Sequence, residues 1–264
     1  MTAATDAAGV VATYEQRAQF ARTETAAVRQ PRLLRGLLES ATHVAEIPCG
    51  AGHFLSDYAR AEVTVTLVDA SAAMLSVSVE RAAKAGISTN RTFPTLAYLN
   101  DLRLPGGIDL VIAPNGALNQ LACQSPLTDL LAALRKTMRN GTEVLAQVAC
   151  IHPGGAVDAA TFYDATCHSG VWLADRRFDA TQAAGAAHRY RRQHRDGDCL
   201  RIDFDYQDAT GKSLHTATVE LTLFTARRLT EAFTAAGFAH VRFLPGQDGL
   251  SEVLATVDSA EVWS

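Results

Sequence analysis

The sequence is poor in cysteine, and its cysteines have no pattern that would bind a metal or form a disulfide framework. Five cysteines are scattered through 264 residues, with no C-x-x-C pair. No apolar run approaches the ~18 residues that span a bilayer, and the N-terminal segment lacks the basic-then-apolar layout of a secretory signal. The net charge is −4, which gives no global positive field to attract nucleic acid or an anionic membrane. We therefore expect a reduced, cytoplasmic protein without a metal site.

What is present is the composition of a folded protein with a large core, 48% apolar and 20% charged. Residues 14–40 have helical spacing, which Pro31 divides into two helices, and residues 1–41 form the expected N-terminal helical segment. Strand and helix patterns then alternate through residues 42–150. The expected strands are 42–47, 63–68, 108–113 and 142–149, and the expected helices are 54–60, 72–85 with Ser71 as N-cap, and 126–140 with Ser125 as N-cap. This alternation predicts a mostly parallel sheet with helices on both faces.

After this core, the pattern predicts an antiparallel β insertion over residues 151–225. Strand-like stretches follow one another at 171–178, 187–194, 199–206 and 216–224. The middle two are joined by residues 196–198, and a three-residue loop there sets Arg195 opposite Cys199, His194 opposite Leu200 and Tyr190 opposite Phe204. Residues 226–264 return as a helix and a strand pair, which complete a seven-stranded core sheet.

The first candidate binding element is a small-residue turn between a strand and a helix. Gly50 and Gly52 allow the backbone to come close to a ligand where a Cβ would collide. The next strand ends in Asp69, where an acid accepts hydrogen bonds from both ribose hydroxyls of a nucleoside. Asp69 could instead cap the following helix together with Ser71. The turn and the acid together predict a nucleoside site.

Two residues, Leu55 and Glu46, distinguish a site for a dinucleotide from a site for a nucleoside without phosphate. The dinucleotide fingerprint requires a third glycine, and Leu55 stands in that place. Glu46 precedes the turn and would repel a pyrophosphate, whereas a cationic amine and a sulfonium suit an acidic strand end. The charge pattern therefore favours S-adenosylmethionine.

Four segments in order resemble the motifs of the class I S-adenosylmethionine-dependent methyltransferases, which have a Rossmann-like fold. They are the turn from Glu46 to Gly52 with Pro48 and Cys49, the acid Asp69 with Ala70, Ser71 and Met74, the loop with Asp101 and Leu102, and the strand end with Pro114 and Asn115. The resemblance implies S-adenosylmethionine as cofactor, S-adenosylhomocysteine as product, and these residues as the cofactor site. It also implies that the N-terminal segment with Tyr14 closes over the cofactor.

The antiparallel insertion resembles that of small-molecule N-methyltransferases of the glycine and amino-sugar kind, in which it forms a wall over the acceptor. Trp172, Tyr190 and Arg192 are the expected substrate-binding residues. The arginines of the insertion could equally form a solvated, salt-bridged face. If the acceptor is a hydroxyl, it needs a general base, and His152 and His168 are the candidates.

The sequence therefore predicts a methyltransferase that acts on a nitrogen or oxygen of a small molecule, as a monomer or homodimer. An NAD(P)-dependent oxidoreductase and a non-catalytic nucleoside-binding protein remain alternatives. A methyltransferase acting on protein or nucleic acid is less favoured, because the sequence offers no basic groove, and because Pro114-Asn115-Gly116 differs from the N-P-P-Y motif that accompanies a flipped base.

Overall fold

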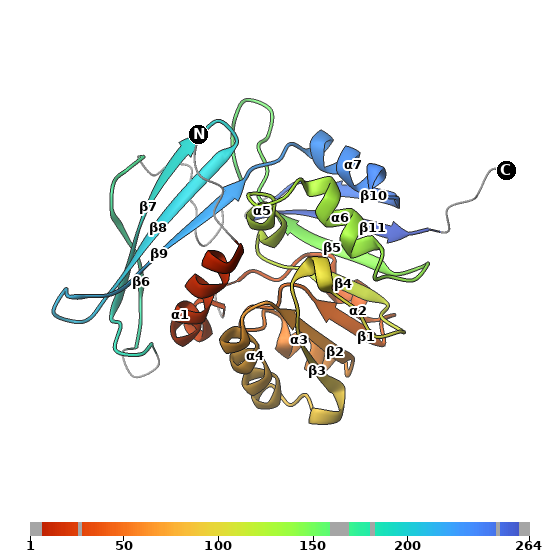
Figure 1. The fold of residues 1–264 in the computed structure, drawn as a ribbon, viewed down its shortest axis with the longest axis horizontal. Helices are drawn as coiled ribbons and strands as arrows, with labels where there is room; N and C mark the ends of the chain where they lie inside the picture. Colours follow the sequence, from red (N-terminus) through yellow and green to blue (C-terminus); the bar gives the residue numbers. More distant parts are fainter. Residues whose placement is uncertain (1–6, 26–27, 159–168, 180–182, 247–248, 259–264) are drawn as a thin grey trace.

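The computed structural model describes residues 7–25, 28–158, 169–179, 183–246 and 249–258. Within these ranges the chain forms two β-sheets, and the N-terminal helix α1 (Ala7–Thr25) lies between them (Figure 1). The larger sheet has seven strands in the order β10-β11-β5-β4-β1-β2-β3, and the smaller has four in the order β6-β7-β8-β9. The predicted α/β fold with an antiparallel β insertion is confirmed.

The centre of the larger sheet is parallel and buried. Its strands are β1 (His43–Glu46), β2 (Thr64–Asp69), β4 (Leu110–Ala113) and β5 (Glu143–Val148). One face packs on α2 (Leu34–Leu38), α3 (Leu55–Arg60) and α4 (Ala72–Lys84), and the other on α6 (Leu127–Arg135) and α7 (Ala226–Ala235). The sheet ends in the antiparallel strands β10 (Phe238–Leu244) and β11 (Ser251–Val257). Because helices cover both faces, these strands are almost continuously apolar.

Two details of the core differ from the sequence prediction. The pattern misses the strand β3 (Thr92–Leu96), because Pro94 interrupts it. Proline is tolerated there because β3 is an edge strand that pairs with β2 alone. The predicted cap at Ser125 is wrong: Pro126 occupies the N-cap position of α6, no side chain caps the helix, and it ends at Arg135.

Helix α1 is buried on two sides. Ala18 and Ala21 pack on Met74 of α4. Phe20 stacks on Tyr206 of the insertion sheet, with 4.4 Å between the ring centroids. Because both sides are covered, α1 has no single apolar stripe, and the sequence pattern places its start too late. No helix in the described part of the chain has the length and apolar character required to cross a lipid bilayer.

The insertion sheet consists of β6 (Leu173–Arg177), β7 (His188–Asp196), β8 (Cys199–Gln207) and β9 (Ser213–Thr222). The predicted register of its central hairpin is wrong by one residue. Asp196 lies opposite Cys199, which leaves a two-residue turn with Gly197 at φ +58°, and Tyr190 lies opposite Asp205. Two-residue hairpin turns favour glycine at such positive φ values.

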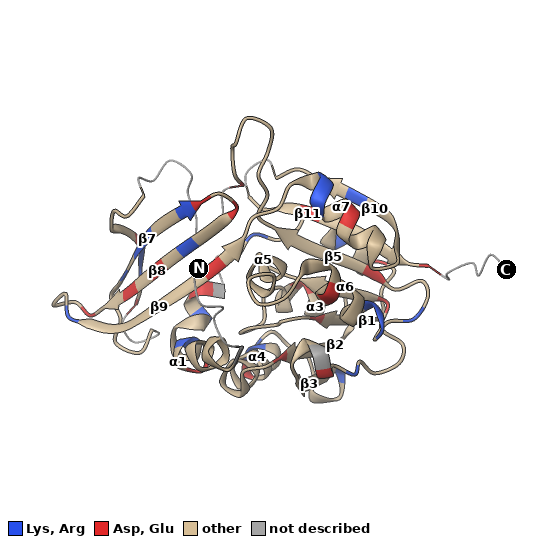
Figure 2. Cartoon of the chain, turned by 45° about the horizontal axis from the view of Figure 1, so that its top comes forward, with Lys and Arg blue, Asp and Glu red and all other residues tan. Residues whose placement is uncertain are grey.

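A shift of one residue exchanges the two faces of a strand. Arg189, Arg191 and Gln193 are therefore buried on the face toward α1, whereas Tyr190 and Arg192 lie on the opposite face. Figure 2 shows acidic and basic residues interleaved along the strands of this sheet. The shift decides which of these charges can reach a ligand.

Candidate functional site

A pocket lies at the carboxyl ends of the parallel strands, next to α1. The loops after β1, β2 and β4 form its floor, α1 contributes Tyr14, and the insertion sheet contributes Phe204. Ligands of open α/β sheets bind at this edge. Eight of the residues predicted to bind the cofactor line the pocket: Tyr14, Pro48, Asp69, Ala70, Ser71, Met74, Pro114 and Asn115.

Asp69 is held in place by the backbone on both sides. Its Oδ2 accepts a hydrogen bond from the Gly50 N–H at 2.7 Å, and its Oδ1 accepts one from the Ser71 N–H at 2.8 Å. The residue is 8% exposed. Burial raises the pKa of Asp69, while the two backbone donors act in the opposite direction. Each carboxylate oxygen keeps a further lone pair that can accept a hydroxyl.

The glycine turn is shaped by its own packing. Gly52 has φ +78°, and a Cβ there would lie 2.5 Å from Leu55 Cδ1. Gly50 has φ +51°, and its Cβ would meet only His53 Cε1, at 3.4 Å. Contact with Leu55 is therefore enough to require glycine at position 52, whether or not a ligand is bound. The turn presents Pro48 and Ala51 to the pocket, whereas Cys49, Gly50 and Gly52 do not line it.

Glu46 is enclosed behind the turn. It is 0% exposed, its Oε2 accepts a hydrogen bond from the Tyr58 hydroxyl at 2.6 Å, and its Oε1 accepts one from the His53 N–H at 2.8 Å. The same Oε1 lies 3.0 Å from His53 Nδ1. Burial and the charge of Glu46 raise the pKa of Tyr58 well above its usual range. The direct contact predicted between Glu46 and the cofactor is not what the structure shows, and His53 lines the pocket instead.

On the α1 side, Tyr14 is anchored to α5 (Ala117–Leu121). Its hydroxyl donates to Gln120 Oε1 at 2.6 Å, and burial raises its pKa. Ser71 caps α4 by accepting a hydrogen bond from the Met74 N–H at 3.1 Å. Tyr14, Ser71 and Met74 therefore have structural contacts in addition to their place in the pocket.

The other two predicted motifs contribute unequally. Asn115 has φ +50°, and its N–H donates to Gln147 Oε1 at 3.0 Å, which turns the chain beside the pocket. Asp101 is exposed and Leu102 is buried in the core, and neither lines the pocket. The adjoining wall is formed by Ala97, Tyr98 and Leu99.

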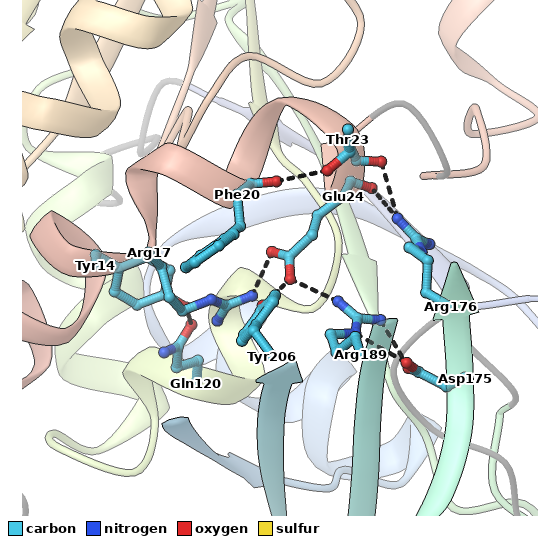
Figure 3. Close-up of polar contacts among 10 residues, drawn as sticks. All are labelled: Tyr14, Arg17, Phe20, Thr23, Glu24, Gln120, Asp175, Arg176, Arg189 and Tyr206. Atoms are coloured by element: carbon cyan, nitrogen blue, oxygen red, sulfur yellow. Dashed lines mark hydrogen bonds and ion pairs between the residues drawn. The ribbon is translucent and has the colours of Figure 1, made fainter. Parts of the chain in front are cut away.

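The wall toward the insertion sheet is a network centred on Glu24 (Figure 3). Its carboxylate lies 2.6 Å from Arg17 Nη2 and 2.6 Å from Arg189 Nη1, and it accepts a hydrogen bond from the Tyr206 hydroxyl. Burial opposes ionisation of Glu24, but the two arginines outweigh it and lower the pKa to about 2. Arg189 also lies 2.7 Å from the carboxylate of Asp175. The network fixes α1 on the insertion sheet.

Arg176 adds a positive charge to this wall. Its Nη1 donates to the carbonyl oxygens of Thr23 at 2.9 Å and Glu24 at 3.3 Å, at the carboxyl end of α1. Burial, with the charge of Arg189 in addition, lowers the pKa of Arg176. Both arginines line the pocket, so its far end is polar and carries more positive than negative charge.

The comparisons with known proteins agree with this arrangement. Residues 44–141 match the family model of a methyltransferase domain. This segment is a methyltransferase domain. No curated protein matches the chain significantly.

Three solved structures have the same fold as this chain. The sugar N-methyltransferase KedS8 from a Streptoalloteichus species has a TM-score of 0.65 at 21% identity, over 94% of this chain and 88% of that one. DesVI from Streptomyces venezuelae has a TM-score of 0.61 at 19% identity, over 93% of this chain and 92% of that one. CalS10 from Micromonospora echinaspora has a TM-score of 0.60 at 18% identity, over 92% of this chain and 91% of that one. It is an amino pentose methyltransferase whose structure was solved with S-adenosylmethionine bound. The predictions of a methyltransferase domain and of the class I fold are confirmed, and the oxidoreductase alternative is not favoured.

The three residues expected to bind the substrate lie outside the pocket. Arg192 Nε contacts Asp203 Oδ2 at 2.9 Å, and its guanidinium lies 4.8 Å from the centre of the Trp172 ring. Trp172 is 42% exposed, and neither it, Tyr190 nor Arg192 lines the pocket. The one-residue error in the predicted register explains why Tyr190 and Arg192 were expected on the wrong face of the sheet. The same error is why Arg189 was not predicted: with the correct turn, the alternation along the strand places Arg189 on the face toward α1.

Of the two predicted bases, the structure describes His152 alone, and His152 does not line the pocket. His152 Nε2 contacts Asp158 Oδ1, and Asp158 Oδ2 accepts hydrogen bonds from the Cys150 and Ser251 N–H groups. His152 therefore belongs to a junction at the start of the insertion, and it does not line the pocket. His168 lies outside the described residues.

Proposed function

We propose that this methyltransferase transfers a methyl group from S-adenosylmethionine to an amine of a small hydrophilic molecule of the amino-sugar kind. The observation that carries the proposal is that one continuous pocket extends from Asp69 to the polar wall of the insertion sheet, next to α1. One end suits a nucleoside, and the other suits a polar acceptor.

The residues at the Asp69 end fit the methyl donor. The oriented carboxylate of Asp69 would accept both ribose hydroxyls, and Met74, Tyr98 and Leu99 would contact the adenine. Pro114 and Asn115 lie at the edge of β4, where the resemblance to the family places the transferred methyl group. The donor supplies an activated methyl group on a sulfonium, so the protein needs only to align the nucleophile and exclude water.

The glycine turn disfavours a dinucleotide. In dinucleotide sites the N–H groups of this turn bind the pyrophosphate. Here the Gly50 N–H donates to Asp69, the Gly52 N–H to the Cys49 carbonyl at 2.8 Å, and the His53 N–H to Glu46. These three donors are already used within the protein, which argues against an NAD(P) cofactor on grounds independent of sequence similarity.

The far end of the pocket supports a polar acceptor. KedS8 is a sugar N-methyltransferase and CalS10 an amino pentose methyltransferase, and their likeness to this chain extends over the insertion as well as the core. An amine attacks the methyl carbon in line with the breaking bond to sulfur, S-adenosylhomocysteine leaves, and the amine loses a proton. Tyr14 and the network of Glu24 would hold α1 over this reaction and keep water out.

Calorimetry with S-adenosylhomocysteine and with NADH in parallel tests the donor. We expect binding of the first alone. Asp69→Asn should weaken binding by about 1–3 kcal/mol, because a hydroxyl loses its charged acceptor. Asp101→Asn is the matched control, since Asp101 is an acid of the predicted motifs that does not line the pocket, and its affinity should be unchanged. Equal losses of affinity for S-adenosylhomocysteine in the two variants would contradict the placement of the methyl donor beside Asp69.

Mass spectrometry of amino sugars incubated with enzyme and S-adenosylmethionine tests the acceptor. The amine should gain one methyl group, while the same sugar with a hydroxyl in place of the amine should not react. Donor binding together with methylation of the hydroxyl compound alone would replace nitrogen by oxygen as the accepting atom. Donor binding without turnover on any compound would favour a binding protein.

A further inference from the structure

A buried hydrogen-bonded chain leads from Tyr58 through Glu46 to His53, at the floor of the pocket. Tyr58 and Glu46 are fully buried, whereas the His53 side chain keeps 12% of its surface exposed and lines the pocket. The chain crosses from α3 to the end of β1 and back to the glycine turn. Nothing in the predicted cofactor site explains why a buried carboxylate holds a histidine here.

The hydrogen bonds determine how the imidazole is presented. As a carboxylate, Glu46 can only accept, so it receives the Tyr58 O–H, the His53 N–H and the His53 Nδ1–H. A neutral imidazole with its proton on Nδ1 has a lone pair on Nε2. Among the described residues, no hydrogen bond to His53 Nε2 is formed. The ring therefore offers the pocket an acceptor that is supported by the negative charge of Glu46.

The position of the ring places this acceptor at the donor end. His53 Cε1 lies over the glycine turn, 3.4 Å from where a Gly50 Cβ would be. The Gly50 N–H in turn donates a hydrogen bond to Asp69 Oδ2 at 2.7 Å. His53 is thus close to Asp69, the acid that would bind the ribose, and both line the same pocket.

We propose that His53 Nε2 accepts a hydrogen bond from the α-ammonium group of the methyl donor, with Glu46 and Tyr58 as positioning residues. The inference rests on the proposed function, because it requires S-adenosylmethionine in this pocket. It assigns Glu46 an indirect role: its negative charge acts on the cationic amine through the imidazole.

The test compares His53→Asn with the wild-type protein by calorimetry. Asparagine keeps an N–H near the position of Nδ1 to donate to Glu46, but it has no atom at the position of Nε2. The ligands are S-adenosylhomocysteine, its analogue without the α-amino group and its analogue without the carboxylate. We expect His53→Asn to weaken the first and third by about tenfold, and the deaminated analogue by less than about twofold.

Each other result has a defined meaning. Equal losses for all three ligands would overturn the proposal and make His53 a structural part of the turn. A loss that disappears only with the analogue lacking the carboxylate would assign His53 to that group and overturn the contact with the amine. A wild-type protein that binds none of them would refute the proposed function itself.

A measurement on the wild-type protein avoids dependence on the folding of the variant. The nitrogen NMR signal of His53 Nε2 should shift when S-adenosylhomocysteine is added, and much less with the deaminated analogue. Equal shifts with both ligands would also overturn the proposal.

Discussion

Replacement of Glu24 by glutamine removes the charge at the centre of the network that fixes α1. The Glu24 carboxylate contacts Arg17 and Arg189, and accepts a hydrogen bond from Tyr206. Its pKa falls from the ordinary 4.5 to about 2 in the folded protein. That displacement corresponds to about 3 kcal/mol of stability at neutral pH. Breaking one partner of a buried ion pair costs a similar amount, about 3–5 kcal/mol.

The sign of the pH dependence follows from the lowered pKa. The ionised carboxylate stabilises the folded state fully above the ordinary pKa of 4.5, and this contribution is lost as the pH falls toward about 2. Urea denaturation of the wild type and Glu24→Gln over a series of pH values should show a constant gap near neutrality that narrows in acid. Hydrogen exchange of the α1 amides will reveal the loss if the helix undocks before the rest unfolds.

Glu80→Gln is the matched control. Glu80 also contacts two cations, Arg22 and Lys84, but its side chain is 44% exposed, so its loss should cost less than about 1 kcal/mol. Our interpretation of Glu24 is refuted if its replacement costs no more than that of Glu80, or if the gap between Glu24→Gln and the wild type persists unchanged in acid. It also predicts weaker S-adenosylhomocysteine binding by Glu24→Gln, because α1 lines the pocket.

Two further substitutions test local features of the site. Gly52→Ala should destabilise the protein by about 1–3 kcal/mol, because the added Cβ would overlap Leu55 and the residue has a positive φ. Thermal denaturation should show a smaller loss of stability for Gly50→Ala, and a larger loss for Gly50→Ala than for Gly52→Ala would contradict the proposed packing of the turn. Ser71→Ala should cost about 1 kcal/mol through loss of the α4 cap, while Ser125→Ala, at the incorrectly predicted cap, should have little effect on the same measurement. Equal losses for the two serines would refute the assigned helix start.

The donor end of the site is encoded by residues that are close together in sequence. A strand, a turn with glycine and a second strand ending in Asp69 place the acid next to the turn, because adjacent parallel strands end at the same edge of the sheet. The alternation of strands and helices likewise predicts the fold class. Both inferences depend on patterns within short stretches of sequence, and contacts with distant parts of the chain do not change the secondary structure that these patterns predict.

The acceptor end depends on contacts between distant segments. Whether Arg189 or Arg192 faces the pocket follows from the length of one hairpin turn, and a single residue reverses the answer. Glu24 meets Arg189 across 165 positions of the chain, and no periodicity predicts such a pair. Glu46 illustrates the same limit within a correctly predicted motif: the sequence places an acid at the strand end, but the packing of Tyr58 and His53 decides that the carboxylate turns away from the pocket. The sequence by itself determined the sheet and the edge at which the pocket lies, because these follow from short-range order. Tertiary packing alone decided which charges line the pocket, because side-chain direction depends on register and on partners far away in the chain.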